Sequence, residues 1–224
     1  MIFKNRIEAA RKLAGALSHY RGKNPLVLAI PRGAVPMAKV IADLLKGELD
    51  VVLVRKLGAP GNPEFAIGAV DETGWVYLAP WAEETGISEE YLEKTKEREL
   101  ATIRARRAQY TPARPPKNPQ GRIVIVVDDG LATGSTMIAA LHAIRAKNPQ
   151  RLVCAVPVAP PDTVEKIRSH CDEVVCLHTP ENFYAVGQFY LDFSEVTDEE
   201  VIELLKESNS EKDTNQGKIG DEIP

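Results

Sequence analysis

The sequence predicts an α/β fold in which helices cover both faces of a mainly parallel, twisted sheet. Short apolar runs rich in Val and Ile alternate along the chain with segments in which apolar residues recur at helical spacing. This alternation is typical of repeated strand–helix–strand units. One run, Ile123–Val127, is entirely β-branched, as expected for a strand buried on both faces of a parallel sheet.

In the first half of the chain, caps and turn residues mark where the elements change. Ser88 precedes two glutamates and predicts a helix start, because its hydroxyl can cap the first turn and the acids favour the positive helix end. Residues 71–74, Asp-Glu-Thr-Gly, predict a hairpin turn. The expected elements are helices over about Arg6–His19, Val35–Leu45 and Ser88–Gln109, strands over Leu26–Ile30 and Val51–Val54, and hairpin strands over Ala66–Val70 and Trp75–Leu78.

The second half continues the alternation after a proline-rich connection, residues 111–120, which we interpret as a loop within one domain. Pro161 suits the first position of a helix, and Thr197 with Glu200 forms a capping box for the last helix. We expect one domain over residues 1–206 and a disordered acidic tail over residues 207–224. The expected elements are strands over Ile123–Val127, Leu152–Pro157 and Glu173–Leu177, and helices over Ser135–Lys147, from Pro161, and from Thr197 to about Lys206.

Composition limits the classes of protein that fit. The chain has 224 residues, 44% of them hydrophobic, and a net charge of −4, so its overall charge gives no reason to expect nucleic-acid binding. Residues 94–122 nevertheless carry nine Lys or Arg against two Glu. This basic segment is either a surface for a partner or a solvated helix face followed by a loop, which is the commoner behaviour of charge runs.

The cysteines and the N-terminus bear on the compartment. Cys154, Cys171 and Cys176 lie in or beside apolar strands without metal-ligand spacing, as expected of buried thiols in a reducing environment. The N-terminal residues lack the apolar core of a signal peptide, and no apolar run of about 18 residues could span a bilayer. We expect a cytoplasmic protein without a membrane partner, and a homo-oligomer stays open.

The segment Ile123–Thr136, IVIVVDDGLATGST, carries the strongest functional signal. Its two acids, Asp128 and Asp129, follow the buried strand and therefore lie at the carboxyl edge of the sheet, where open α/β folds bind ligands. The next residues offer backbone N–H groups, hydroxyls and a helix N-terminus, all suited to an anion. A ligand with vicinal hydroxyls and a phosphate fits both halves, because carboxylates accept hydrogen bonds from hydroxyls.

Other motifs fit this segment less well. A Walker phosphate loop needs Gly-Lys-Ser/Thr, and the segment contains no Lys. A dinucleotide fingerprint needs G-x-G-x-x-G, which the spacing of Gly130 and Gly134 does not match. The acidic pocket of receiver domains also has adjacent acids after a strand, but no hydroxyl-rich loop follows them there. The remaining alternative is an ordinary strand-to-helix turn capped by Ser135 or Thr136.

The segment closely resembles the phosphoribosyl diphosphate (PRPP) binding motif of the type I phosphoribosyltransferases, and within that family the chain resembles a bacterial or archaeal subgroup. The family motif is an apolar strand, two acids, two variable residues, a small residue and Thr-Gly-x-Thr or Thr-Gly-x-Ser. The resemblance extends over about Leu26–Lys206 and implies the family fold with a small hood subdomain. It implies that Asp128 and Asp129 hold the ribose and that the following residues hold the 5′-phosphate: Ala132, Thr133, Gly134, Ser135 and Thr136.

Cations are expected at two further strand ends. Arg32 and Gly33 follow the first predicted strand, and the resemblance implies that this loop holds pyrophosphate, which the glycine lets approach the backbone. Arg55 and Lys56 lie just beyond Val51–Val54 and would add charge at the same edge. Their alternative is a pair of solvated charges. We assign catalytic roles to Arg32, Lys56, Asp128 and Asp129, and PRPP-binding roles to these four and to Gly33 and Arg55.

Two further segments match parts of the family. Residues 57–64, LGAPGNPE, are either a surface turn or the flap that closes over PRPP in these enzymes. Residues 181–196 would form the hood, and whether the N-terminal helix belongs to it stays open. There the resemblance implies that Phe183 or Tyr184 stacks on a base and that Asp192 contacts the magnesium shell. Gly187 and Asp192 stand one residue further apart than in purine enzymes, and aromatic packing of a small subdomain is the alternative.

One position departs from the purine enzymes. Ala132 stands where hypoxanthine and guanine enzymes carry an Asp that handles the purine N7 proton, whereas adenine and other members carry a small residue. His178, near the hood, titrates near neutrality and is a candidate base, with a packed or exposed histidine as the alternative. The acceptor base is therefore not determined by the sequence.

Together these features predict a Mg²⁺-dependent phosphoribosyltransferase that transfers the 5-phosphoribosyl group of PRPP to a nitrogenous base and releases pyrophosphate. Mg²⁺ would be bound largely through PRPP oxygens. Two alternatives stay open. One is a PRPP-sensing regulator that binds nucleic acid through the basic segment, and the other is a nucleotide-binding module without transfer activity.

Overall fold

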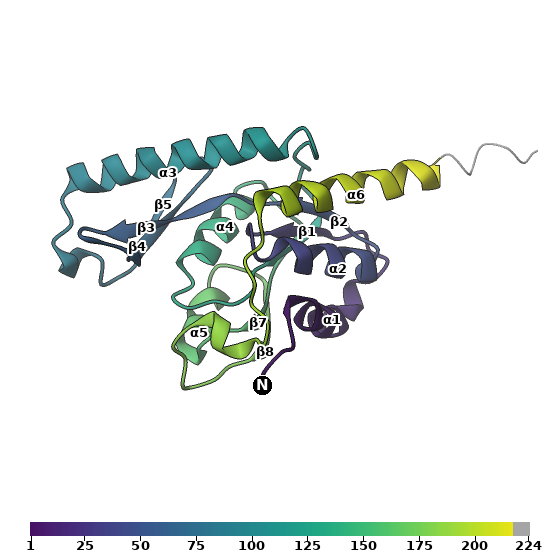
Figure 1. The fold of residues 1–224 in the computed structure, drawn as a ribbon, viewed down its shortest axis with the longest axis horizontal. Coiled ribbons are helices and arrows are strands. Elements are labelled where there is room, and N and C mark those ends of the chain that lie inside the picture. Colours follow the sequence, from purple (N-terminus) through teal and green to yellow (C-terminus); the bar gives the residue numbers. More distant parts are fainter. Residues whose placement is uncertain (217–224) are drawn as a thin grey trace, which may run out of the picture.

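The computed structural model describes residues 1–216, except for the side chains of residues 63, 64, 83 and 209–216. Its centre is a five-stranded sheet in the order β2-β1-β6-β7-β8, in which every neighbouring pair is parallel. Figure 1 shows this sheet with helices packed around it, and the predicted α/β class is confirmed. In sheet order the strands span Glu48–Val51, Leu26–Ala29, Ile123–Val127, Arg151–Val158 and Glu173–His178.

Helices cover both faces of the sheet. Helices α1 and α2 pack on one face, and α4 and α5 on the other. Side chains alternate along β6, so that Ile125 and Val127 join the first layer while Val124 and Val126 join the second. Strand β6 is thus buried on both faces, as its composition predicts. Helices α1, α2, α4 and α5 span Arg6–Ala16, Val35–Leu45, Ser135–Arg145 and Pro161–Arg168, respectively.

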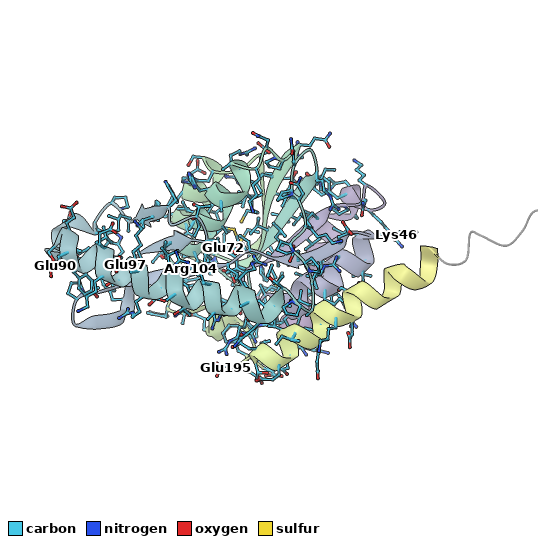
Figure 2. All side chains as sticks on the ribbon, turned by 90° about the horizontal axis from the view of Figure 1, so that it is seen from above. Lys46, Glu72, Glu90, Glu97, Arg104 and Glu195 are labelled. Carbon is cyan, nitrogen blue, oxygen red and sulfur yellow. The ribbon has the colours of Figure 1, made fainter. Side chains whose placement is uncertain are left out.

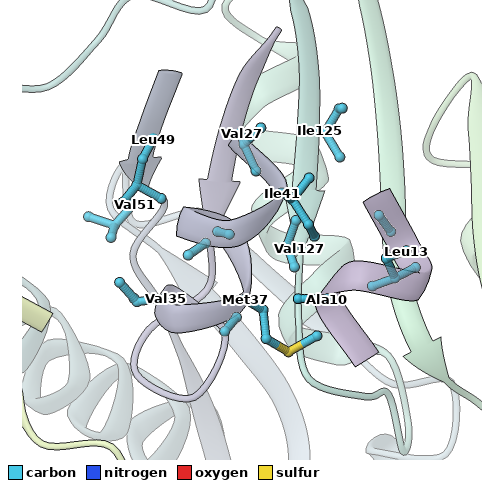
Figure 3. Close-up of a cluster of buried hydrophobic side chains, with 14 of the residues drawn as sticks. Ala10, Leu13, Val27, Val35, Met37, Ile41, Leu49, Val51, Ile125 and Val127 are labelled. Atoms are coloured by element: carbon cyan, nitrogen blue, oxygen red, sulfur yellow. The ribbon is translucent and has the colours of Figure 1, made fainter. Parts of the chain in front are cut away.

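The first layer is centred on α2. Figure 3 shows Ile41 of this helix between Val27 of β1 and Val127 of β6, and Met37 one turn earlier beside Ala10 of α1. All five side chains are fully buried. This packing fixes the strand ends from which the site loops leave the sheet.

A second, antiparallel sheet forms an arm beside the parallel one. Strands β3 and β4 of this sheet pack against the long helix α3, and in Figure 1 the arm extends away from the parallel sheet. The predicted turn at residues 71–74 joins two of the strands, and the Asp71 carboxylate accepts hydrogen bonds from the backbone N–H groups of Thr73 and Trp75. The elements are β3 (Val54–Ala59), β4 (Asn62–Asp71), β5 (Val76–Leu78) and α3 (Glu89–Tyr110).

The strand predicted at the start of the arm is placed wrongly. The strand expected at Val51–Val54 is β2, which ends at Val51, and after two residues the chain enters β3 of the other sheet. The apolar run is buried throughout, so its composition cannot show where one sheet gives way to the other. Residues 57–64, expected as either a surface turn or a flap, form the tip of the β3–β4 hairpin, with register shifts between Leu57 and Ala59, and the flap stays a prediction.

The helix caps and the C-terminal helix give a mixed result. The Ser88 hydroxyl accepts a hydrogen bond from the Tyr91 N–H, and Thr197 and Glu200 form the predicted capping box. Helix α6 (Asp198–Gln216) continues beyond its expected end near Lys206, because no Gly or Pro interrupts the sequence before Gln216. The rest of the predicted tail, residues 217–224, lies outside the described residues.

The N-terminal segment is paired with the hood. The Phe3 N–H donates to the Phe189 carbonyl at 2.8 Å, and the Leu191 N–H donates to the Phe3 carbonyl at 2.9 Å. The first helix therefore begins beside residues that are nearly two hundred positions later in the chain. Within residues 1–216, no helix combines the length and the apolar character that a membrane span needs.

Replacing Ile41 tests the α2 layer. The side chain is fully buried, so Ile41→Ala should lower the free energy of unfolding by about 2 to 5 kcal/mol. Leu44 on the same helix is 45% exposed, and Leu44→Ala should change it by less than about 0.5 kcal/mol. Urea unfolding of both variants measures this, and equal losses would contradict the assignment of buried and exposed faces.

Candidate functional site

The candidate site lies at the carboxyl edge of the parallel sheet, between the loops that follow β1 and β6. Ala29 pairs with Val127 in register, so the two strands end side by side and their loops leave the same edge. Gly33 in the first loop packs directly on Asp129 in the second, because a methyl group at position 33 would lie 2.2 Å from Asp129 Oδ2. Only glycine permits this approach, and the sequence placed both residues in one site.

The two acids of the motif lie together in a buried setting. The Asp129 N–H donates to Asp128 Oδ1 at 2.9 Å. Burial raises the pKa of Asp128 well above its usual range, and the neighbouring charge of Asp129 raises it further. Burial also raises the pKa of Asp129, while Arg6 and Lys56 act in the opposite direction. Negative charge is therefore costly at this pair, and the two cations offset part of that cost.

The loop after the acids has the geometry of an anion cradle. Gly134 has a φ of +78° and precedes the first turn of α4, whose N-terminal N–H groups attract negative charge. The Thr133 and Ser135 hydroxyls lie 3.1 Å apart. From α5, the Thr163 hydroxyl donates to the Ala132 carbonyl at 2.7 Å and Lys166 Nζ donates to the Thr133 carbonyl at 3.3 Å. The sequence did not single out these two α5 residues, which support the loop from behind.

Arg32 lies at the predicted strand end and is held by two acids, one just before α6 and one at its first residue. Its guanidinium pairs with Glu195 and, at 3.4 Å, with Asp198. Glu195 is labelled in Figure 2 beside the first turn of that helix. The peptide bond between Pro31 and Arg32 is cis. Since Glu195 is exposed, Arg32 has one partner that an incoming anion could replace.

Arg55 and Lys56 do not share one environment. Both lie within β3 rather than at the end of a parallel strand, which corrects the predicted placement. Arg55 donates to Glu99 of α3 at 2.8 Å, so its charge is already matched inside the arm. Lys56 lowers the pKa of both Asp128 and Asp129, so its charge acts on the acidic pair. The arm thus supplies one cation to the site.

The hood residues are distributed differently from the expectation. The Phe183 ring packs on Phe189 with centroids 5.3 Å apart, whereas Tyr184 is 89% exposed. Asp192 accepts hydrogen bonds from the backbone and the hydroxyl of Ser194. His178 lies 2.9 Å from the amino group of Met1, and burial together with that positive charge lowers its pKa. Base stacking and a metal contact for these residues stay predictions.

Two residues absent from the predicted site contact the acidic pair. Arg6 of α1 binds Asp129 through Nε at 2.9 Å and Nη2 at 2.8 Å. The Tyr190 hydroxyl donates to the Asp129 carbonyl at 2.6 Å. The sequence held one sign that Arg6 is directed inward. It stands four and seven positions before the buried residues Ala10 and Leu13, so this charged residue lies on the apolar face of the helix.

The available ligands suit a metal that brings its own oxygen donors. Among the described residues, no cluster of three or more His, Cys, Asp or Glu could hold a metal ion by itself. Two adjacent carboxylates beside an anion cradle fit a Mg²⁺ ion that shares its coordination with a polyphosphate. Each carboxylate already has one oxygen engaged, Asp128 Oδ1 by the Asp129 N–H and Asp129 Oδ2 by Arg6, so such a metal would be held mainly through the oxygens of its ligand.

Comparison with known proteins identifies the family. Residues 2–194 match the family model of the phosphoribosyl transferase domain, and the chain belongs to this family. Two Mycobacterium tuberculosis proteins, "Putative phosphoribosyl transferase MT0597" from strain CDC 1551 / Oshkosh and "Putative phosphoribosyl transferase Rv0571c" from strain H37Rv, are 40% identical to it over 205 residues, which cover 91% of this chain and 46% of each relative. The chain therefore spans about half the length of these relatives.

A solved structure supports the same fold. The crystal structure of TT1426 from Thermus thermophilus is similar to this chain with a TM-score of 0.78 and 48% sequence identity, over 92% of this chain and 99% of that chain. The recognition of the type I phosphoribosyltransferase family from the sequence is confirmed.

Asparagine at position 128 should stabilise the protein at neutral pH. Because burial raises the pKa of Asp128, the folded state keeps a proton that the unfolded state releases near its ordinary pKa of about 3.9. Wild-type stability therefore falls as the pH rises through this window, and Asp128→Asn avoids the fall. Thermal midpoints should show a gain for the variant at pH 7 that shrinks toward pH 4, and a gain independent of pH would contradict the assignment.

A methyl group at Gly33 should disrupt the contact between the two loops. Gly33→Ala would collide with Asp129, and relieving that overlap should cost about 1 to 3 kcal/mol of stability. A methyl group at Gly15 of α1 would meet nothing within 4 Å beyond the backbone of its own helix, so Gly15→Ala should instead stabilise the helix by up to about 1 kcal/mol. Urea unfolding measures the change in the free energy of unfolding for both variants. An unchanged value for Gly33→Ala would show that the loops are not packed as described.

Proposed function

We propose that this protein is a Mg²⁺-dependent phosphoribosyltransferase, which transfers the 5-phosphoribosyl group of PRPP to a nitrogenous base and releases pyrophosphate. The observation that carries the proposal is the direct packing of Gly33 on Asp129. It joins a cationic loop, an acidic pair and an anion cradle into one continuous surface at the edge of the sheet. PRPP presents a pyrophosphate, two ribose hydroxyls and a 5′-phosphate in the same order.

Each part of the donor has a matching part of the site. The carboxylates of Asp128 and Asp129 accept hydrogen bonds from the ribose hydroxyls. The loop over residues 132–136 and the N-terminus of α4 receive the 5′-phosphate. Arg32 and the backbone at Gly33 receive the pyrophosphate, and Lys56 adds positive charge. Bound in this way, the ribose C1 is held in place while its bond to pyrophosphate breaks.

The chemistry needs placement and charge stabilisation rather than a protein nucleophile. As the C1–O bond breaks, positive charge develops on the ribose and negative charge on the leaving pyrophosphate. The buried acids face the first charge, and Arg32 and Lys56 face the second. Mg²⁺, held largely through PRPP oxygens beside the two acids, would neutralise part of the pyrophosphate charge. Holding donor and acceptor together removes the entropy cost of their encounter.

The basic segment gives weaker support to a nucleic-acid-binding regulator. Seven of its nine cations form ion pairs with carboxylates of this chain: Lys96, Arg98, Arg106, Arg107, Arg114, Lys117 and Arg122. Paired side chains offer less charge to phosphates than a free basic patch would. The enzyme is therefore the function that the arrangement supports best, and the regulator is the alternative that the experiment below distinguishes.

Pyrophosphate release tests the proposal directly. The protein is incubated with PRPP, Mg²⁺ and a panel of purine, pyrimidine and other nitrogenous bases. The Asp128→Asn, Asp129→Asn double variant should lose at least about 100-fold in rate, since hydrogen bonds to charged groups contribute about 1.5 to 3 kcal/mol each. Asp162→Asn, an exposed change at the start of α5, serves as the control and should retain the wild-type rate.

The outcomes separate the alternatives. If the wild type releases no pyrophosphate with any base, the transferase proposal fails for that panel. PRPP binding that survives the double variant would contradict the ribose assignment. Nucleic-acid binding that persists in the double variant and weakens steeply with salt would instead identify the regulator.

A further inference from the structure

The Arg6 side chain contacts several parts of the site at once. It comes from helix α1, outside the loops that follow β1 and β6. Its Nε and Nη2 atoms both contact Oδ2 of Asp129, at 2.9 and 2.8 Å. Only 12% of the Arg6 side chain and 16% of the Asp129 side chain are exposed. Ion pairs that are removed from solvent in this way depend strongly on both partners, because losing one leaves a buried charge unpaired.

The Arg6 guanidinium also contacts residues of the hood. Nη1 donates to the Ser194 carbonyl at 2.6 Å, and the guanidinium carbon lies 3.9 Å from the centre of the Phe193 ring. Phe193 in turn packs on Gly187, where a methyl group would lie 3.2 Å from its ring. The cation–π contact with the ring and the hydrogen bond to the carbonyl together restrict the orientation of the guanidinium.

Arg6 also touches the loop after β1. A methyl group at Gly33 would lie 3.0 Å from Arg6 Nη2 and 3.2 Å from Nε. The guanidinium is thus enclosed by the first loop, by Asp129 of the second loop and by the hood. Both of its Asp129 contacts use Oδ2, so Arg6 fixes the carboxylate orientation from one side and leaves Oδ1 outside the contact.

We propose that Arg6 is a positioning residue, which orients the Asp129 carboxylate for the ribose of the donor and couples that orientation to the hood. The proposal rests on the proposed function, because the ribose is the ligand that Asp129 would hold. In this arrangement any shift of residues 193–194 moves the guanidinium, and the guanidinium moves the carboxylate. Arg6 then couples the hood to the donor site through the side chain of Asp129, while the Tyr190 hydroxyl contacts the Asp129 carbonyl.

Three variants test this role. Arg6→Met keeps the length and apolar stem of the side chain but removes its charge and its donors. Arg6→Lys keeps the charge but not the planar pair of contacts. Arg11→Met is the matched control, because Arg11 lies on the exposed face of the same helix.

PRPP binding in the presence of Mg²⁺, measured by calorimetry between pH 5 and 8, gives the first readout. Arg6→Met should bind PRPP roughly tenfold more weakly or worse at pH 7, the loss expected from one hydrogen bond to a charged group. Because Arg6 lowers the pKa of Asp129, its removal should also move the acid-side loss of affinity to higher pH. Arg6→Lys should restore most of the pH profile and only part of the affinity.

The Asp129 carboxylate itself gives the second readout, and it requires no ligand. Carbon-13 NMR of labelled aspartates, with Asp129→Asn for assignment, should show Asp129 titrating at higher pH in Arg6→Met than in the wild type or in Arg11→Met. If the wild type binds no PRPP, the proposed function fails, and this titration still decides whether Arg6 governs Asp129. Unchanged titration and unchanged PRPP affinity in a folded Arg6→Met protein would overturn the inference.

Discussion

The parallel pairing of β1 with β6 is the constraint on which the rest of the site depends. Since Ala29 and Val127 are in register, both strands end at the same level, and the loops that follow them are in contact directly beyond the strand ends. Gly33 then packs against Asp129 with no room for a side chain. This single contact determines that the cationic loop and the acidic pair form one surface, and the core layers around α2 and α4 hold the two strand ends in place.

Two carboxylates at such a junction are costly unless cations accompany them. The structure supplies those cations from elements that are distant in sequence: Arg6 from the first helix and Lys56 from the arm. The Asp129 N–H adds a hydrogen bond to Asp128. The negative charge of the site is therefore partly balanced, and a ligand that carries both hydroxyls and phosphates can exchange these contacts for its own.

The segment from Phe193 to Asp198 connects the two arginines of the site. Its aromatic ring and the carbonyl of Ser194 hold Arg6, while Glu195 and Asp198 hold Arg32. The same short segment leads from the hood into α6. A change in the hood would thus reach the acidic pair and the Arg32 loop together.

The sequence by itself determined the α/β class, most helix and strand positions, the acidic motif with its anion loop, and the cationic loop after β1. These are local properties: apolar periodicity, caps, and loops that directly follow a buried strand. The tertiary structure alone decided where the first sheet gives way to the arm, that Arg55 pairs with Glu99 while Lys56 acts on the acids, and that Arg6 binds Asp129. Those contacts join residues that are up to 123 positions apart, and no local pattern encodes which distant charges the packing of helices and sheets will bring together.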